Sequence, residues 1–325
     1  MREINFFNKH QKNWEEIDSL LSSNDKVSAD HLSELYIKLT DDLAYAQTNY
    51  PGSKTEQYLN LLAKKVHLRI YKNKKQKSNR IAEFYLLELP TIVYTHRTAL
   101  LVSFIIFTLS ALIGAFSTHV DEDFPRLIMG DHYVDMTIQN IEKGNPMGVY
   151  ESMDPVPMFL YITFNNIKVS FMVFAFGILF SFMSGFMLFR NGIMLGCFQY
   201  FFYTKKLLYI SALTIWVHGT LEIASIVIAG GAGLALGNSF MFPGTYTRLY
   251  AFQKAAKESV KIIAGLIPVF VVAGFLESFV TRYSSISTLP AMFIIAFSLF
   301  FLIYYFIYYP LKLNINGQNQ LPQRA

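Results

Sequence analysis

The chain has 325 residues and a formal net charge of +5, with 53% hydrophobic and only 16% charged residues. This composition is too apolar for an ordinary soluble domain, and the apolar residues concentrate after about residue 98, so we predict an integral membrane protein. The one cysteine, Cys197, excludes an internal disulfide and a multi-cysteine metal site. The sequence contains no phosphate-binding loop or dinucleotide fingerprint, so any nucleotide chemistry belongs to a partner.

Residues 1–97 have the periodicity of helices. Apolar residues from Trp14 to Leu21 recur at spacings of three and four, and the pattern resumes at Tyr58 after a turn signal at residues 49–53. We predict a cytoplasmic, basic helical domain over 1–97 that ends in an interfacial helix near residues 84–90.

The last part of this domain is strongly basic. Between Lys64 and Arg80 there are eight Lys or Arg residues and no acid. Such a segment can bind anionic lipid headgroups at about 1 kcal/mol per basic residue near the surface, and a solvated helix face is the alternative. No nucleic-acid motif accompanies the charge, so nucleic acid is not an expected partner.

The apolar stretches that follow predict an all-α, multi-pass membrane bundle over residues 98–311. Candidate spans are 98–117, 168–189, 193–203, 207–236, 260–280 and 289–309. That makes about six spans, but residues 193–203 rise only about 17 Å as a helix against a hydrocarbon core of about 30 Å. This piece is therefore either a short tilted span or a re-entrant half-helix. Residues 312–325 are predicted to form a polar tail.

Basic residues predict the orientation. In a six-span bundle the amino-terminal domain, Arg190, the 248–261 connection and Lys312 all fall on one side, which the positive-inside rule makes cytoplasmic. The connection 118–157 falls on the other side and carries eight acidic residues, as expected of an extracytoplasmic loop. Both termini are then cytoplasmic. If residues 193–203 re-enter instead of crossing, everything after them inverts.

Ionisable side chains inside the apolar stretches mark a candidate polar site. His218 and Glu222 are four residues apart and therefore share one helix face. A charge at the bilayer centre costs about 2.5–3.5 kcal/mol on insertion scales, so both should face protein or a cavity. Glu277 is the third such group, and Asn166 and Asn191 complete the set.

The two asparagines also have ordinary explanations. Asn165-Asn166 can cap a span that begins near Lys168, and Asn191-Gly192 can form a turn between spans. Because 25 residues of helix separate Asn166 from Asn191 by about 38 Å, at most one of them should approach His218.

Small residues predict where helices pack closely, because TM helices approach each other best where side chains are small. Two stripes with a four-residue spacing are Gly177, Ser181 and Gly185, and Ser225, Ala229, Gly233 and Gly237. The contact is either within one chain or at a dimer seam.

Several segments carry a resemblance to a known family: Leu35-Tyr36, Asp42-Leu43-Ala44, Tyr58-Leu59-Asn60, the basic helix ending at Tyr71, Phe164-Asn165-Asn166-Ile167, Asn191-Gly192, His218-Gly219-Thr220-Leu221-Glu222, Ala229-Gly230-Gly231-Ala232-Gly233-Leu234 and Phe275-Leu276-Glu277-Ser278-Phe279. Through these segments the chain resembles the stage II sporulation protein M family of bacterial membrane proteins over nearly its whole length. Relatives commonly have proline where this chain has Val217, which removes one reason for the helix to break at His218.

The resemblance implies a multi-pass protein of the bacterial cytoplasmic (inner) membrane. The family's namesake works with partners that remodel peptidoglycan during engulfment of the forespore. Relatives in bacteria that never sporulate are often encoded beside a MoxR-type ATPase, so the sporulation role is not carried over. The family offers no established catalytic residues to transfer.

Three functions remain open from the sequence. The first is a non-enzymatic scaffold or assembly factor of an envelope complex, with no cofactor or metal, whose partners are membrane lipids, other envelope proteins or a second copy of the chain. The second is a transporter or lipid-handling carrier that uses His218 and Glu222. The third is an intramembrane metal-dependent hydrolase, in which Glu277 or Asn191 completes the ligand set.

Overall fold

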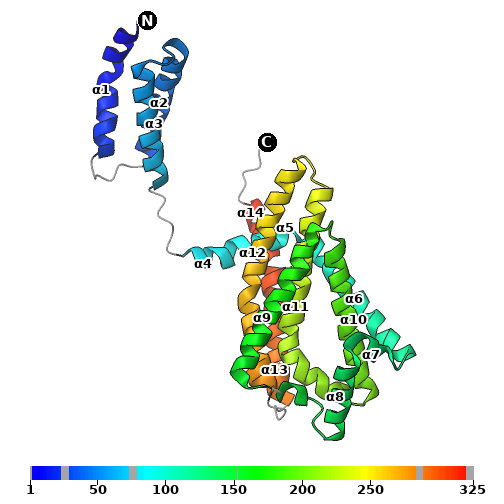
Figure 1. The fold of residues 1–325 in the computed structure, drawn as a ribbon. Helices are drawn as coiled ribbons and strands as arrows, with labels where there is room; N and C mark the ends of the chain where they lie inside the picture. Colours follow the sequence, from blue (N-terminus) through cyan, green and yellow to red (C-terminus); the bar gives the residue numbers. More distant parts are fainter. Residues whose placement is uncertain (1, 23–28, 73–78, 152, 283–287, 320–325) are drawn as a thin grey trace. The chain divides into compact units, whose positions relative to one another are not determined.

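The computed structural model describes residues 2–22, 29–72, 79–151, 153–282 and 288–319 (Figure 1). Within these ranges every regular element is a helix. The chain divides into two compact units, Met1–Arg80 and Ile81–Ala325.

The first unit consists of α1 (Glu3–Ser22), α2 (Ala29–Asn49) and α3 (Lys54–Lys72). Its apolar faces meet in a core around Trp14, which is 1% exposed and donates a hydrogen bond from Nε1 to Asp42 Oδ2 over 2.9 Å. At the turn between α2 and α3, Gly52 has a φ of +78°, a conformation that favours glycine. Residues 73–78 of the predicted basic segment lie outside the described residues.

The second unit contains the remaining elements. They are α4 (Arg80–Glu83), η1 (Phe84–Glu88), α5 (Leu89–Thr95), α6 (Arg97–Val120), α7 (Phe124–Met129), α8 (Asp131–Glu142), η2 (Gly148–Glu151), α9 (Pro155–Ala175), η3 (Phe176–Ile178), α10 (Phe182–Thr204), α11 (Leu208–Met241), α12 (Arg248–Phe275), η4 (Leu276–Thr281), α13 (Thr288–Ile303), η5 (Tyr304–Tyr308) and α14 (Tyr309–Asn319). Here η1, η4 and η5 are π-helical turns, whereas η2 and η3 are 3-10 turns.

Five stretches of the described chain are long and apolar enough to cross a membrane: Arg97–Val120, Pro155–Ile178, Leu208–Met241, Arg248–Thr281 and Thr288–Ile315. A sixth long helix, α10, has 23 residues and packs against α6 and α11. At about 1.5 Å per residue it rises about 35 Å, which is enough for the hydrocarbon core. The protein is an all-α, multi-pass helical membrane protein.

The boundaries of two predicted spans were wrong. The predicted span 168–189 is interrupted after η3, because Phe180 and Ser181 adopt left-handed backbone conformations with φ of 53° and 66°. Helix α9 therefore begins earlier, at Pro155, and α10 begins at Phe182. The predicted short piece 193–203 is the second half of α10, not a separate or re-entrant element.

Helix α11 is the central helix of the bundle. It is continuous through His218-Gly219 and packs against α6, α9, α10, α12 and α13. Its neighbours contact it through backbone and small side chains: Ser103 Oγ donates to the Val227 carbonyl over 2.6 Å, and Ser259 Oγ donates to the Ala232 carbonyl over 3.0 Å.

The segment before α6 belongs to the bundle. Leu89 is fully buried in the main core, and the hydroxyls of Tyr305 and Tyr309 donate to the carbonyls of Tyr85 and Leu86. The predicted interfacial helix is thus packed on α12 and α14. Residues 312–319, predicted as part of a polar tail, continue α14. Within this unit α5 and α14 lie at one end, and α7 and α8 lie at the other (Figure 1).

Candidate functional site

A polar cluster lies where α11, α9 and η4 meet. His218 and Glu222 project from one face of α11, and Glu277 projects from the π-helical turn η4. One ligand atom from each of these three residues lies within 4.8 Å of the others, and His218 Nε2 is 3.9 Å from Glu277 Oε1. His218 is about 15 Å from the start of α11, since ten residues of helix precede it. The cluster is therefore within the membrane bundle.

Thr281 orients the imidazole of His218. Its Oγ1 lies 3.0 Å from His218 Nδ1 and donates to the Thr214 carbonyl over 3.4 Å. The hydroxyl donates to Nδ1 or accepts from Nδ1–H, according to the tautomer of the imidazole. Nε2 is the ring nitrogen nearer Glu277. Thr281 was missed from sequence, although it follows Glu277 by four residues and that spacing places both on one helix face.

Asn166 joins the cluster, and Asn191 does not. The buried amide of Asn166 lies beside the carboxyl of Glu222, and its Nδ2 has no hydrogen-bond partner among the described residues. Asn166 lies in the middle of α9, so its predicted capping role was wrong. Asn191 lies inside α10 and donates to the Met187 carbonyl over 2.8 Å, so the predicted turn at Asn191-Gly192 was also wrong.

The small-residue stripes meet within the chain. An added Cβ at Gly177 would overlap the Gly233 carbonyl, and one at Gly237 would overlap Ser181. Ser225 and Ala229 are buried on α11. Gly185 differs, because an added Cβ there would meet no atom within 4 Å. The first stripe is not on one helix, since the break at Phe180 and Ser181 divides it.

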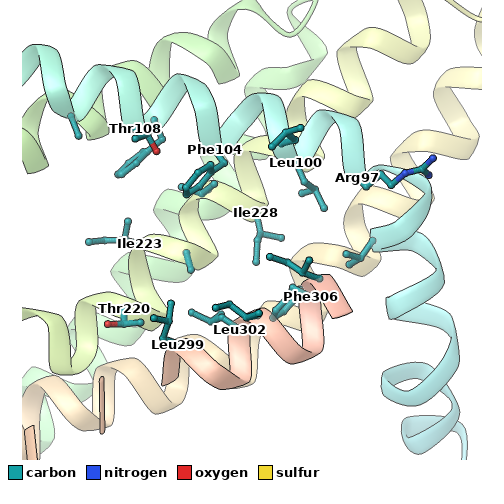
Figure 2. Close-up of a pocket in the computed structure, with 18 of the residues that line it drawn as sticks. Arg97, Leu100, Phe104, Thr108, Thr220, Ile223, Ile228, Leu299, Leu302 and Phe306 are labelled. Atoms are coloured by element: carbon teal, nitrogen blue, oxygen red, sulfur yellow. The ribbon is translucent and has the colours of Figure 1, made fainter. Parts of the chain in front are cut away.

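A large apolar groove opens on the other side of α11, between α6 and α13 (Figure 2). Its volume is about 1060 Å³, and its walls are α6 and the α13–α14 segment, with α11 as its floor. On α6 the lining runs from Arg97 to Ala115, which is about 27 Å of helix and close to the thickness of a hydrocarbon core. Figure 2 shows Phe104 on α6 facing Leu299 and Leu302 across the opening.

The groove lining includes a few polar groups. Gln199, from α10, has a buried Nε2 with no hydrogen-bond partner among the described residues. Arg97 stands at the start of α6, where its guanidinium lies 4.2 Å from the centroid of the Tyr94 ring and donates to the Tyr94 carbonyl. No sequence pattern indicated the groove, because it depends on the gap between α6 and α13 in the folded bundle.

The comparison with known families decides the identity of the membrane part. Residues 103–282, more than half of the chain, match the family described as stage II sporulation protein M. The chain belongs to this family. In this stage II sporulation protein M family member the matched region runs from α6 to just after η4, so it contains the entire polar cluster. Residues 4–72 match a domain of unknown function, DUF8413, and cover α1 to α3. No curated protein and no solved structure matches the chain.

Proposed function

We propose that this family member is a non-enzymatic membrane scaffold of a bacterial envelope complex, and that its groove receives a transmembrane helix of a partner protein. The groove carries the proposal. The groove runs about the depth of a bilayer beside a tightly packed bundle. Helices α6 and α13 line its two sides, in the way that neighbouring helices of a bundle lie on either side of a third helix. We assign both termini to the cytoplasmic side of the inner membrane, in line with the charge asymmetry of the sequence.

Two features of the lining favour a helix over a lipid chain. The lining contains the small residues Ala111, Ala115 and Ala224, which allow a second backbone to approach closely. The unpartnered Nε2 of Gln199 needs an acceptor, since an unsatisfied polar group in hydrocarbon costs several kcal/mol. A helix offers carbonyl and hydroxyl acceptors. An acyl chain offers none.

The test uses a photo-crosslinking residue placed at Phe104 in the full-length protein in cells. The matched control is Ile105, the exposed neighbour on α6 that does not line the groove. We expect Phe104 to give an adduct whose attachment point maps to an apolar span of another protein, and Ile105 to give none. Thr108→Trp, which fills the groove, should reduce the adduct by about tenfold or more, equivalent to about 1.4 kcal/mol.

Leu109→Trp controls for the substitution itself. Leu109 is exposed on α6 and lies outside the groove, so this variant should leave the adduct unchanged. Equal crosslinking from Phe104 and Ile105, or the absence of any adduct to a separate protein span, would contradict the scaffold proposal. Adducts to a second copy of this chain would make the groove a homodimer seam instead.

Lipid handling is the second candidate, and Arg97 is the observation that favours it. A guanidinium at the end of a long apolar groove is placed to bind a phosphate while an acyl chain fills the groove. In that case Phe104 would label phospholipid alone, and Arg97→Gln would lower the labelling. That pair of results would replace the scaffold by a lipid-binding function.

A further inference from the structure

The polar cluster has more negative charge than the protein compensates. Glu222 and Glu277 bring two half-buried carboxyl groups close together, and no Lys or Arg of the described residues forms an ion pair with either. A carboxylate largely removed from water without a cationic partner is costly, so the pair requires protons or a bound cation.

The distances within the cluster suit ligands of one ion. Two ligand atoms that each lie about 2.0–2.2 Å from a Zn²⁺ ion are at most about 4.4 Å apart. His218 Nε2 and Glu277 Oε1 are 3.9 Å apart, which is too far for a hydrogen bond and within that limit. The widest spacing among the three ligand atoms is below 4.8 Å, so a small side-chain rotation completes the set.

The surroundings resemble the outer layer of a metal site. A metal-binding histidine usually donates its other ring N–H to an oxygen, and here Thr281 Oγ1 lies 3.0 Å from Nδ1, within reach of such a bond. Thr281 is itself held by the Thr214 carbonyl. The contact with Thr281 orients the ring so that Nε2 lies on the side of Glu277.

An independent observation comes from Asn166. Its side chain is buried, its Nδ2 has no partner among the described residues, and it lies beside Glu222. Because the amide orientation is interchangeable, Asn166 can present Oδ1 to the cluster as a further oxygen ligand. Four more buried hydroxyls without a described partner lie on the same three elements: Thr163, Ser170, Ser225 and Ser278.

We infer that His218, Glu222 and Glu277 bind one divalent transition-metal ion inside the membrane bundle. One imidazole nitrogen with carboxylate oxygens is a ligand set for Zn²⁺ or Mn²⁺, and Zn²⁺ binds more tightly by the Irving–Williams order. The ion ties α11 to η4 and neutralises the two carboxylates. The inference goes beyond the scaffold proposal, because the cluster and the groove lie on different faces of α11.

The experiment measures metal directly on the full-length protein in detergent or nanodiscs. Protein stripped with a chelator is titrated with Zn²⁺ or Mn²⁺, and bound metal is counted by mass spectrometry. We expect about one Zn²⁺ per chain, with affinity about a hundredfold or more lower in Glu277→Gln, which keeps the shape of the side chain. Thr281→Val should weaken binding by about 10- to 100-fold, because it leaves the ligands and removes only their orientation.

A second His–Glu pair in the same bundle provides the control. His96 Nε2 lies 2.8 Å from Glu258 Oε2, on α12 away from the cluster, so Glu258→Gln should bind Zn²⁺ as the unaltered protein does. Thr108→Trp in the groove should also leave metal binding unchanged. If Glu277→Gln does not fold, X-ray absorption of the Zn²⁺-loaded unaltered protein still decides, with nitrogen and oxygen neighbours at about 2.0–2.2 Å and one imidazole expected.

Three results would overturn the inference. One is binding of less than about a tenth of an equivalent by folded, unaltered protein, which would leave protons as the compensating cations. Another is equal Zn²⁺ affinity in Glu277→Gln and the unaltered protein. The third is an absorption spectrum without an imidazole.

Discussion

Trp14→Ala is expected to unfold the amino-terminal helical unit and leave the membrane bundle intact. Trp14 is 1% exposed, packs against Phe6 and Tyr58, and donates to Asp42. Truncating such a side chain costs about 3–5 kcal/mol. The whole stability of a unit of this size is about 4–12 kcal/mol, so the loss is a large fraction of it. Hydrogen exchange on the full-length protein should show lost protection in α1 to α3.

The control for this prediction is Leu61→Ala. Leu61 lies on α3 and is 63% exposed, so removing its side chain should change stability by less than about 0.5 kcal/mol. Peptides from α11 should keep their protection in both variants, since the two units have separate cores. Retained protection of α1 to α3 in Trp14→Ala would show that the tryptophan is not central to this unit.

Periodicity predicted the helices of the amino-terminal unit because each buries one face. The residues from Trp14 to Leu21 that recur at three and four do meet the core, as Trp14 and Ile17 show. The apolar stretches of the bundle were also visible, but their ends were not. In a membrane helix apolar residues continue on all faces, so hydrophobicity alone does not mark where α9 stops and α10 starts.

The turn between α9 and α10 shows why the ends of these helices were not predicted. It has no proline or asparagine, and Phe180 and Ser181 take the left-handed conformations that glycine usually takes. Tertiary packing holds them there, because Ser181 Oγ donates to the Leu234 carbonyl of α11. Asn191-Gly192 had the composition of a turn but stays helical, since Gly192 packs directly on α6 near Phe107.

The candidate site was partly predictable. The i, i+4 spacing of His218 and Glu222 predicted that they share one helix face. The free-energy cost of placing a carboxylate in the membrane indicated Glu277 as a further member of the site. The approach of Glu277 and Thr281 to His218 depends on the packing of α12 and η4 against α11. The register of two packed helices leaves no pattern in one sequence.

Gly233→Leu is expected to prevent assembly of the bundle. A Cβ at Gly233 would overlap Ser184 Oγ and lie 2.9 Å from the Val173 carbonyl, and the Gly233 carbonyl itself contacts Gly177. Helix α11 cannot move away to admit a leucine without breaking the hydrogen bond from Ser181 Oγ to the Leu234 carbonyl. Overpacking on this scale costs about 3 kcal/mol or more, so the yield of monodisperse protein in size-exclusion chromatography and its melting temperature should both fall sharply.

Gly185→Leu is the control that shows whether a loss of stability in Gly233→Leu comes from close helix packing or from replacing a flexible glycine. Gly185 is inside α10, and an added Cβ there meets no atom within 4 Å, so leucine gains helix propensity without a clash. This variant should be as stable as the unaltered protein or slightly more stable. If both leucine variants lose stability equally, the effect comes from changing a membrane glycine, and the contact between α9, α10 and α11 is not what holds the bundle together. If only Gly233→Leu fails, backbone contact at this crossing is what holds α9 and α10 against α11.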